Sequence, residues 1–185
     1  MDILSGLTLA APAGLNAYIP LLAVALGERF GWIHLAAPYD LLGSWWLIGL
    51  IAVLLIVEVV ADKVPAVDHA NDVIQTVVRP AAGGLLAVSA SHHGTVGPIV
   101  LVVAGVLIAG SVHAVKASAR PVVNVSTAGA GAPVVSTLED VGAVVLTVLA
   151  LLVPVLAAIV IIAAVVLAIV LIRRWRRRHA EARAA

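Results

Sequence analysis

Four long stretches of this chain contain no Asp, Glu, Lys or Arg, and they limit what the chain can fold into. They cover about 5–27, 41–57, 80–115 and 141–172. Each is near or above the ~18 residues that indicate a membrane-spanning segment. Charged residues make up only 11% of the sequence, whereas a soluble globular domain has about 25%. The sequence therefore predicts an all-α polytopic membrane protein.

Prolines and interfacial residues divide these stretches into about six hydrophobic segments, some of them broken or re-entrant. Pro12 and Pro20 interrupt the first, so we expect a broken helix there. A segment at 121–135 would cover only ~22 Å as a helix, less than the ~30 Å hydrocarbon core. We expect it to be re-entrant, unwound or an interfacial loop, and we expect Pro154 to kink the last segment. The six segments are about 5–27, 43–61, 68–90, 97–115, 121–135 and 137–172.

Charged residues gather between the second and third of these segments and within the third, in "ADKVPAVDHANDVIQTVVRP". One helix face carries four polar residues at spacings of 4, 3 and 4: Asp68, Asp72, Gln75 and Arg79. Asp68 alone would suit a helix N-cap, but capping does not explain a polar face that continues for three turns. Arg79 lies deep in the segment, where an unpaired charge costs several kcal/mol. We expect it to pair with Glu58 or with a residue of the second half.

A short repeat links this region to the second half of the chain. "PAVDHANDV" at 65–73 aligns without gaps with "PVVSTLEDV" at 133–141, and each copy leads into an apolar stretch. With three segments in each half, the two halves would be inverted in the membrane, as in many transporters. The alternative for the second copy is a capping box, with Ser136 as the N-cap and Glu139 three residues later.

The end of the sequence is strongly basic. "RRWRRRHAEARAA" follows an apolar run directly, and basic residues beside a membrane span stay in the cytoplasm. Such arginines attract acidic lipids without a specific site, so we expect no nucleic-acid binding. We expect a multi-pass protein of the cell membrane with both termini in the cytoplasm, which also places Lys63, Lys116 and Arg120 on that side. The predicted domains are one transmembrane domain at 1–172, with half-repeats of about 1–92 and 93–172, and a tail at 173–185.

The polar region resembles a family signature. "VEVVADKVPAVDHANDVIQTVVRPAAGGLLA" is similar to the pattern of the bacterial membrane family called domain of unknown function 4126. A later S-x-x-E-D element falls on Ser136, Glu139 and Asp140. The opening "AAPAGLNAYIPLL" is similar to the family's first helix, but the family pattern has a basic residue near Asn16. The resemblance covers about 5–160 and implies a bacterial inner-membrane protein without implying an activity. The first pattern falls on Glu58, Asp62, Lys63, Pro65, Asp68, Asp72, Arg79, Pro80, Gly83 and Gly84.

Several kinds of chemistry lack the residues that they need. The chain has no cysteine, which excludes disulfides and thiolate chemistry. His69, His92 and His93 lack a ligand set of fixed spacing, and "SHHGTVGP" predicts a polar turn instead of a metal site. No HExxH, GxSxG or Walker motif occurs. The runs "AAGGLLA" and "AGAGAP" predict close helix packing. We therefore expect neither an enzyme nor a cofactor.

Two functions fit this pattern. The first is a small transporter or channel-like carrier of a small solute or ion, in which Asp72 and Asp140 meet at a central polar site, because ionisable residues inside membranes are usually functional. The second is a non-transporting scaffold or lipid-binding partner protein, in which the acids cap helices and pair with Lys63 and Arg79. We expect membrane lipids and a small solute or cation as partners, and a homo-oligomer stays open. The candidate site residues are Glu58, Asp62, Lys63, Asp68, Asp72, Arg79, Glu139 and Asp140.

Overall fold

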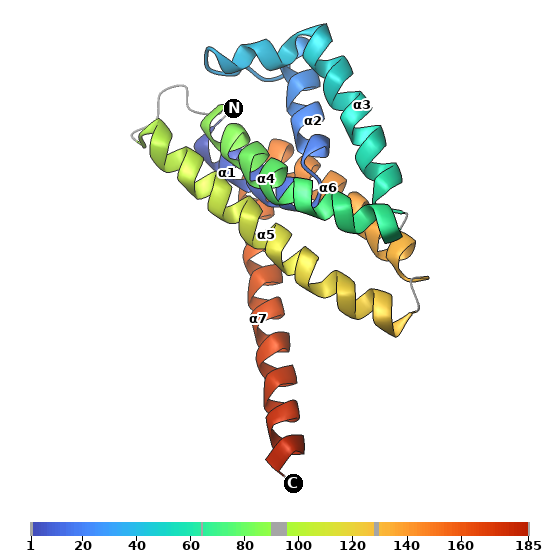
Figure 1. Ribbon diagram of the computed structural model, residues 1–185. Coiled ribbons are helices and arrows are strands. Elements are labelled where there is room, and N and C mark those ends of the chain that lie inside the picture. Colours follow the sequence, from blue (N-terminus) through green and yellow to red (C-terminus); the bar gives the residue numbers. More distant parts are fainter. Residues whose placement is uncertain (1, 64, 90–95, 128–129, 185) are drawn as a thin grey trace.

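The computed structural model describes residues 2–63, 65–89, 96–127 and 130–184, and within these ranges the chain is helical and contains no strand (Figure 1). The all-α prediction is therefore confirmed for the described part of the chain. Seven α-helices and one short 3-10 helix follow one another. They are α1 (Ile3–Leu15), α2 (Tyr18–Arg29), η1 (Tyr39–Gly43), α3 (Trp45–Ala61), α4 (Pro65–Ser89), α5 (Pro98–Ser126), α6 (Ala132–Leu152) and α7 (Pro154–Ala184).

The first hydrophobic segment is broken, as the sequence predicts. Asn16 lies between α1 and α2 with an extended backbone (φ −147°, ψ 117°). Its side-chain oxygen accepts hydrogen bonds from the backbone N–H groups of Tyr18 (3.1 Å) and Ile19 (3.2 Å). These are the first N–H groups of α2, which have no partner within the helix. The residue that ends α1 therefore also caps α2, whereas Pro12 lies inside α1.

Close helix packing surrounds α1, which lies among α4, α5 and α6 (Figure 1). α4 and α5 run side by side and cross at Gly83 and Gly105. A Cβ atom on Gly105 would overlap the backbone carbonyl of Gly83, and a Cβ atom on Gly14 would lie 2.5 Å from the backbone oxygen of Ala109. Glycine is therefore required where α5 meets α4 and α1. The packing role predicted for "AAGGLLA" is confirmed.

The prediction of a separate segment at 121–135 is wrong. α5 continues through Pro121 to Ser126, and α6 begins at Ala132. The helix continues past 115 because Lys116 and Arg120 are buried against carboxylates of other helices and need no loop. The run "AGAGAP" lies at the connection between α5 and α6, and its residues 128–129 are outside the described part of the chain.

Two predicted helix caps are also wrong. Pro133 lies in the first turn of α6, where its missing N–H needs no helical partner. α6 therefore starts before Ser136, which is buried inside the helix instead of acting as the N-cap. In the same way α4 begins at Pro65, so Asp68 lies in the first turn and not at the cap. The side chains of Asp68 and His69, and all of 90–95 with the histidine pair, are outside the described residues.

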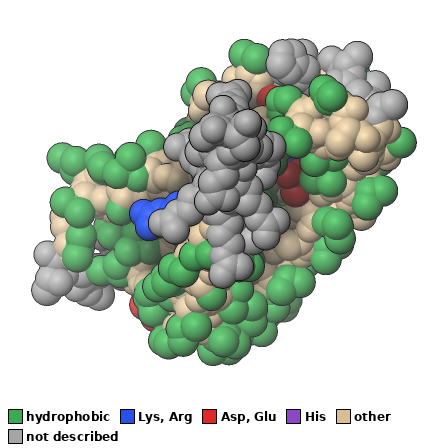
Figure 2. All heavy atoms as spheres, turned by 90° about the horizontal axis from the view of Figure 1, so that it is seen from below, with side chains coloured by type: hydrophobic (Ala, Val, Ile, Leu, Met, Phe, Trp, Pro, Cys, Tyr) green, Lys and Arg blue, Asp and Glu red, His purple; other side chains and the backbone are tan. Residues whose placement is uncertain are grey.

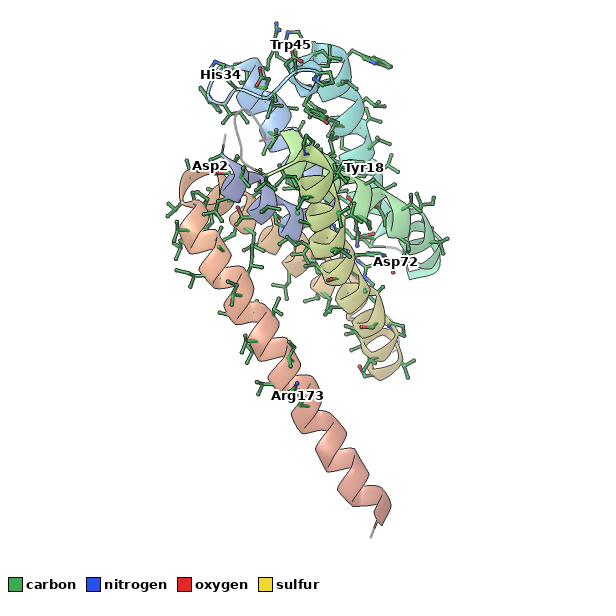
Figure 3. The ribbon with its side chains drawn as sticks, turned by 90° about the vertical axis from the view of Figure 1, so that its left-hand side faces the viewer. Asp2, Tyr18, His34, Trp45, Asp72 and Arg173 are labelled. Atoms are coloured by element: carbon green, nitrogen blue, oxygen red, sulfur yellow. The ribbon has the colours of Figure 1, made fainter. Side chains whose placement is uncertain are left out.

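The last hydrophobic segment is divided at a proline, as expected. α6 ends at Leu152, Val153 is not helical, and α7 begins at Pro154. Proline cannot donate the backbone hydrogen bond that would continue α6. α7 extends away from the other helices (Figure 1), and Arg173 lies along it (Figure 3).

The outer surface of the helices is largely apolar. Two helical stretches, Pro98–Val123 and Ala132–Leu152, are long and apolar enough to cross a membrane. In the most apolar part of each, only 22% is buried, so most of each helix lies at the surface of the protein. Hydrophobic side chains are spread over the face in Figure 2. The exposed valines and leucines of α5 and α6 contrast with charged residues inside the protein.

Candidate functional site

Charged side chains from four helices meet inside the protein, close to the break between α1 and α2. We call this group the polar cluster. α3 and the residues just after it contribute three members, α4 two, α5 three and α6 two. Asp72, which lies at its edge, is labelled in Figure 3. The members are Glu58, Asp62, Lys63, Asp72, Arg79, His113, Lys116, Arg120, Glu139 and Asp140.

Arg79 is the most deeply buried charge, with 0% of its surface exposed. Its guanidinium donates to Glu58 Oε1 at 2.8 Å and lies 3.7 Å from Asp62 Oδ2. The predicted burial of Arg79 and its pairing with Glu58 are thereby confirmed. The carboxylate of Glu58 offsets part of the cost of removing the Arg79 charge from water.

His113 fills the other side of the Arg79 guanidinium. Its Nδ1 lies 3.1 Å from an Arg79 nitrogen and its Nε2 lies 3.2 Å from Thr76 Oγ1. Arginine is only a donor, so Nδ1 accepts, and a neutral ring then carries its proton on Nε2. Nε2 donates to Thr76, whose hydroxyl donates to the backbone oxygen of Asp72 at 2.8 Å. This arrangement assigns one tautomer to the ring.

Asp62 receives more donors than any other described acid. Its Oδ2 accepts from Lys116 at 3.2 Å and from Arg120 at 3.0 Å, and its Oδ1 accepts from Asn71 at 2.9 Å. Burial alone would raise the pKa of this carboxyl, but the charges of Lys116, Arg120 and Arg79 outweigh burial and hold the pKa below its usual value. Asp62 is therefore an ionised acid shared by three cations.

Lys116 and Arg120 connect this acid to other helices. Lys116 Nζ donates to the backbone oxygen of Leu15 at 2.9 Å, at the negative C-terminal end of α1. It also lies 3.0 Å from Glu139 Oε2, which accepts from Arg120 at 3.0 Å. The other terminal nitrogen of Arg120 lies 3.8 Å from Asp72 Oδ1. α1, α4, α5 and α6 are therefore joined through two cations.

Asp140 lies at the opposite edge of the cluster. Asn16 Nδ2 donates to Asp140 Oδ1 at 3.0 Å, and Lys63 Nζ lies 3.9 Å from Asp140 Oδ2. Asp72 and Asp140 thus belong to one cluster, but Glu139, not Asp140, shares a cation with Asp72. Seven of the eight predicted site residues meet here, and the eighth, Asp68, has a side chain outside the described part of the chain.

Sequence reasoning missed the contribution of α5. His113, Lys116 and Arg120 are 4%, 4% and 7% exposed, although we expected the last two on the cytoplasmic side of the membrane. Their spacings of 3 and 4 place all three on one helix face. The criterion that identified the polar face of α4 would therefore have identified this one too. Asn16 carried no comparable signal, because a lone asparagine beside a helix break suggests only a cap.

The described part of the cluster has more acids than cations. Glu58, Asp62, Asp72, Glu139 and Asp140 are five carboxylates, against four cations: Lys63, Arg79, Lys116 and Arg120. Glu58 Oε2 is also buried without a hydrogen-bond partner in the structure. Buried acids in excess favour an added positive charge, either a proton or a bound cation. Among the described residues, no group of three or more His, Asp or Glu side chains is arranged to hold a metal ion.

Comparison with known proteins gives one match. The model of the family described as "Domain of unknown function (DUF4126)" matches residues 3–174. The matched range contains α1 to α6, most of α7 and every member of the polar cluster. No curated protein matches the chain, and no solved structure does.

Proposed function

The chain belongs to the domain of unknown function 4126 family, and from this premise we propose that it is a multi-pass membrane protein that carries a small cationic solute or ion. The observation that supports this is the polar cluster inside helices with apolar outer surfaces. Ionisable groups are expensive within a bilayer and usually mark a pathway or a binding site there. The five carboxylates and four cations of the cluster favour a positively charged ligand.

The break between α1 and α2 supports the same proposal. Interrupted helices bring free backbone groups to ligand sites in many transporters. Here the backbone oxygen of Leu15 points at Lys116, and Asn16 joins the break to Asp140. Backbone groups and ionisable side chains are thus combined at one place, as they are at the ligand sites of such transporters.

We propose six membrane segments, in which α1 and α2 form one broken segment and α3, α4, α5, α6 and α7 are the others. This retains the expected number but assigns the last two segments differently. The two copies of the repeat, at 65–73 and 133–141, begin α4 and α6. With only α5 between them, these helices cross the membrane in the same direction. The repeat therefore does not relate two inverted halves in this arrangement.

The six-segment proposal predicts the sides on which the ends of the chain lie. Reporter domains fused at Asp2 and at Ala185 should both give a cytoplasmic signal, because six crossings return the chain to its starting side. A reporter inserted near Pro38, in the connection before η1, should give the opposite signal. Activity of paired reporters such as alkaline phosphatase and green fluorescent protein measures this. Opposite signals at the two ends would exclude six crossings.

Asp72→Asn should abolish carriage while leaving the fold intact. Asp72 is only partly buried and its described ion pair is long, 3.8 Å to Arg120, so its charge contributes little to stability. Removing that charge balances the described acids and cations at four each, and the cluster loses its preference for a positive charge. We would reconstitute the protein in liposomes and measure proton, sodium and potassium flux with ion-sensitive dyes.

Asp40→Asn is the matched control, because Asp40 is an exposed acid in η1, outside the cluster. Wild type and Asp40→Asn should show equal flux above that of empty liposomes, and Asp72→Asn should show none above it. Flux that is the same in all three proteins, or absent from wild type, would instead favour the scaffold or lipid-binding alternative.

A further inference from the structure

A cavity of about 420 Å³ lies beside the polar cluster, between α5 and α7. Its volume lies within the range of pockets that hold small organic molecules. The α5 wall includes Val112 and Val115, and the α7 wall includes Val165 and Ile169. Leu15 at the end of α1 and two charged members of the cluster, Lys116 and Glu139, also line it. The cavity is therefore apolar along its walls and charged where it meets the cluster.

Glu139 is the charged group that a ligand in this cavity would meet. The Lys116 side chain is 1% exposed, whereas that of Glu139 is 15% exposed. The Lys116 ammonium is also occupied by three oxygen atoms, from Leu15, Asp62 and Glu139. An anionic ligand would have to displace one of them inside a cluster that already has surplus negative charge.

Glu139 can exchange its partners without leaving a cation unpaired. The two cations that it contacts, Lys116 and Arg120, both also contact Asp62 Oδ2, at 3.2 and 3.0 Å. If the Glu139 carboxylate turned towards a ligand in the cavity, those cations would keep an acidic partner. Leaving a buried charge unpaired is the main cost of breaking such an ion pair, and here Asp62 removes most of that cost.

We propose that this cavity binds lipophilic monovalent cations, with the apolar body between α5 and α7 and the positive charge at Glu139. This inference rests on the proposed function, because it specifies the class of cation that reaches the cluster. The apolar walls favour an organic cation over a metal ion. A metal ion would lose its bound water on entering the cavity, and the walls offer few polar atoms to replace that water.

Two ions of the same shape and opposite charge test the proposal. Equilibrium dialysis of the purified protein in detergent, with protein-free micelles as the blank, would compare tetraphenylphosphonium with tetraphenylborate. We expect the cation to bind at least about tenfold more tightly, a difference that a single ionic contact can supply. Equal affinities would overturn the proposal and indicate an apolar groove filled by lipid acyl chains. Absence of saturable cation binding would overturn it as well.

Three variants locate the site. Glu139→Gln should lower the affinity for tetraphenylphosphonium about tenfold, towards that for tetraphenylborate. Ala164→Phe should block binding of both ions, because Ala164 lines the cavity. Ala163→Phe is its control, since this neighbouring exposed residue on α7 does not line the cavity. Melting temperatures would establish that each variant is folded. Unchanged binding in Glu139→Gln or in Ala164→Phe would overturn the proposed site.

Binding and flux separate this inference from the proposed function. Ion flux that depends on Asp72, together with equal binding of the two organic ions, would overturn only the lipophilic-cation site. Charge-selective binding that depends on Glu139, without flux of protons, sodium, potassium or tetraphenylphosphonium, would overturn only the carrier function. The dialysis measurement needs no transport activity, so each result stands on its own.

Discussion

Arg79→Ala should lower the free energy of unfolding by about 3–5 kcal/mol, the usual cost of removing one member of a buried ion pair. Arg79 has no exposed surface, and Glu58, its partner at 2.8 Å, is 1% exposed. Without the guanidinium, the Glu58 carboxylate would lose its described cation and the His113 ring its Nδ1 donor. Thermal unfolding in detergent, followed by tryptophan fluorescence or circular dichroism, would measure the loss.

Arg173→Ala is the matched control, because this exposed arginine of α7 lies away from the cluster (Figure 3). We expect its melting temperature to equal that of wild type. Glu58→Gln combined with Arg79→Ala should be less destabilising than the sum of the two single changes, because the double variant leaves no unpaired carboxylate at position 58. Equal melting temperatures for Arg79→Ala and Arg173→Ala would refute the structural importance of the buried pair.

Gly105→Leu should prevent the close approach of α4 and α5 and give the second large loss of stability. A Cβ atom at this position already overlaps the backbone of Gly83, and it would lie 2.7 Å from the Cβ of Ala87. A leucine would force the two helices apart. Overpacking typically costs about 1–3 kcal/mol, and a contact with rigid backbone lies at the upper end or beyond. Thermal unfolding of the purified variant, or its yield if it does not fold, would measure this effect.

Gly49→Leu is the control for this substitution. Gly49 lies in the apolar helix α3, and a Cβ built there has no atom within 4 Å apart from its chain neighbours and the nearby backbone of α3 itself. Leucine has a better helix propensity than glycine by somewhat less than about 1 kcal/mol, so this variant should be as stable as wild type or slightly more stable. A comparable loss in Gly49→Leu and Gly105→Leu would mean that leucine disturbs any apolar helix here, and that the crossing has no special role.

Local signals in the sequence predicted much of the helical pattern. The division at Pro154 follows from a backbone rule that acts within one or two turns, and it is confirmed. The break in the first segment is also confirmed, but it lies at Asn16, whereas Pro12 lies inside α1 and Pro20 inside α2. The need of Arg79 for an acidic partner follows from cost alone, and of the two possibilities, Glu58 or a residue of the second half, the structure has Glu58. These predictions depend on short-range geometry or on one strong energetic term.

The wrong end of α5 has a different cause from the wrong caps, which is that the charges of Lys116 and Arg120 suggest the end of a membrane segment. Lys116 and Arg120 were assigned to a cytoplasmic boundary, and α5 was therefore expected to end near 115. Whether a charge in an apolar helix is exposed or paired depends on partners that arrive from elsewhere in the chain. One acid that pairs with both of these residues is Asp62, which lies 54 and 58 positions away. The sequence shows these acids and cations, but it does not show which of them meet when the chain folds.

The double role of Asn16 makes the α1–α2 break a mechanical link. One side chain holds the first two amide groups of α2 through its oxygen and Asp140 of α6 through its nitrogen. A shift of α6 must either break the bond to Asp140 or pull the start of α2 with it. We expect a movement of α6, which carries Glu139, to be passed through Asn16 to the start of α2, whose other end leads to the connection before η1. A ligand that rearranges Glu139 would in this way shift the connection between α2 and η1, which lies away from the polar cluster.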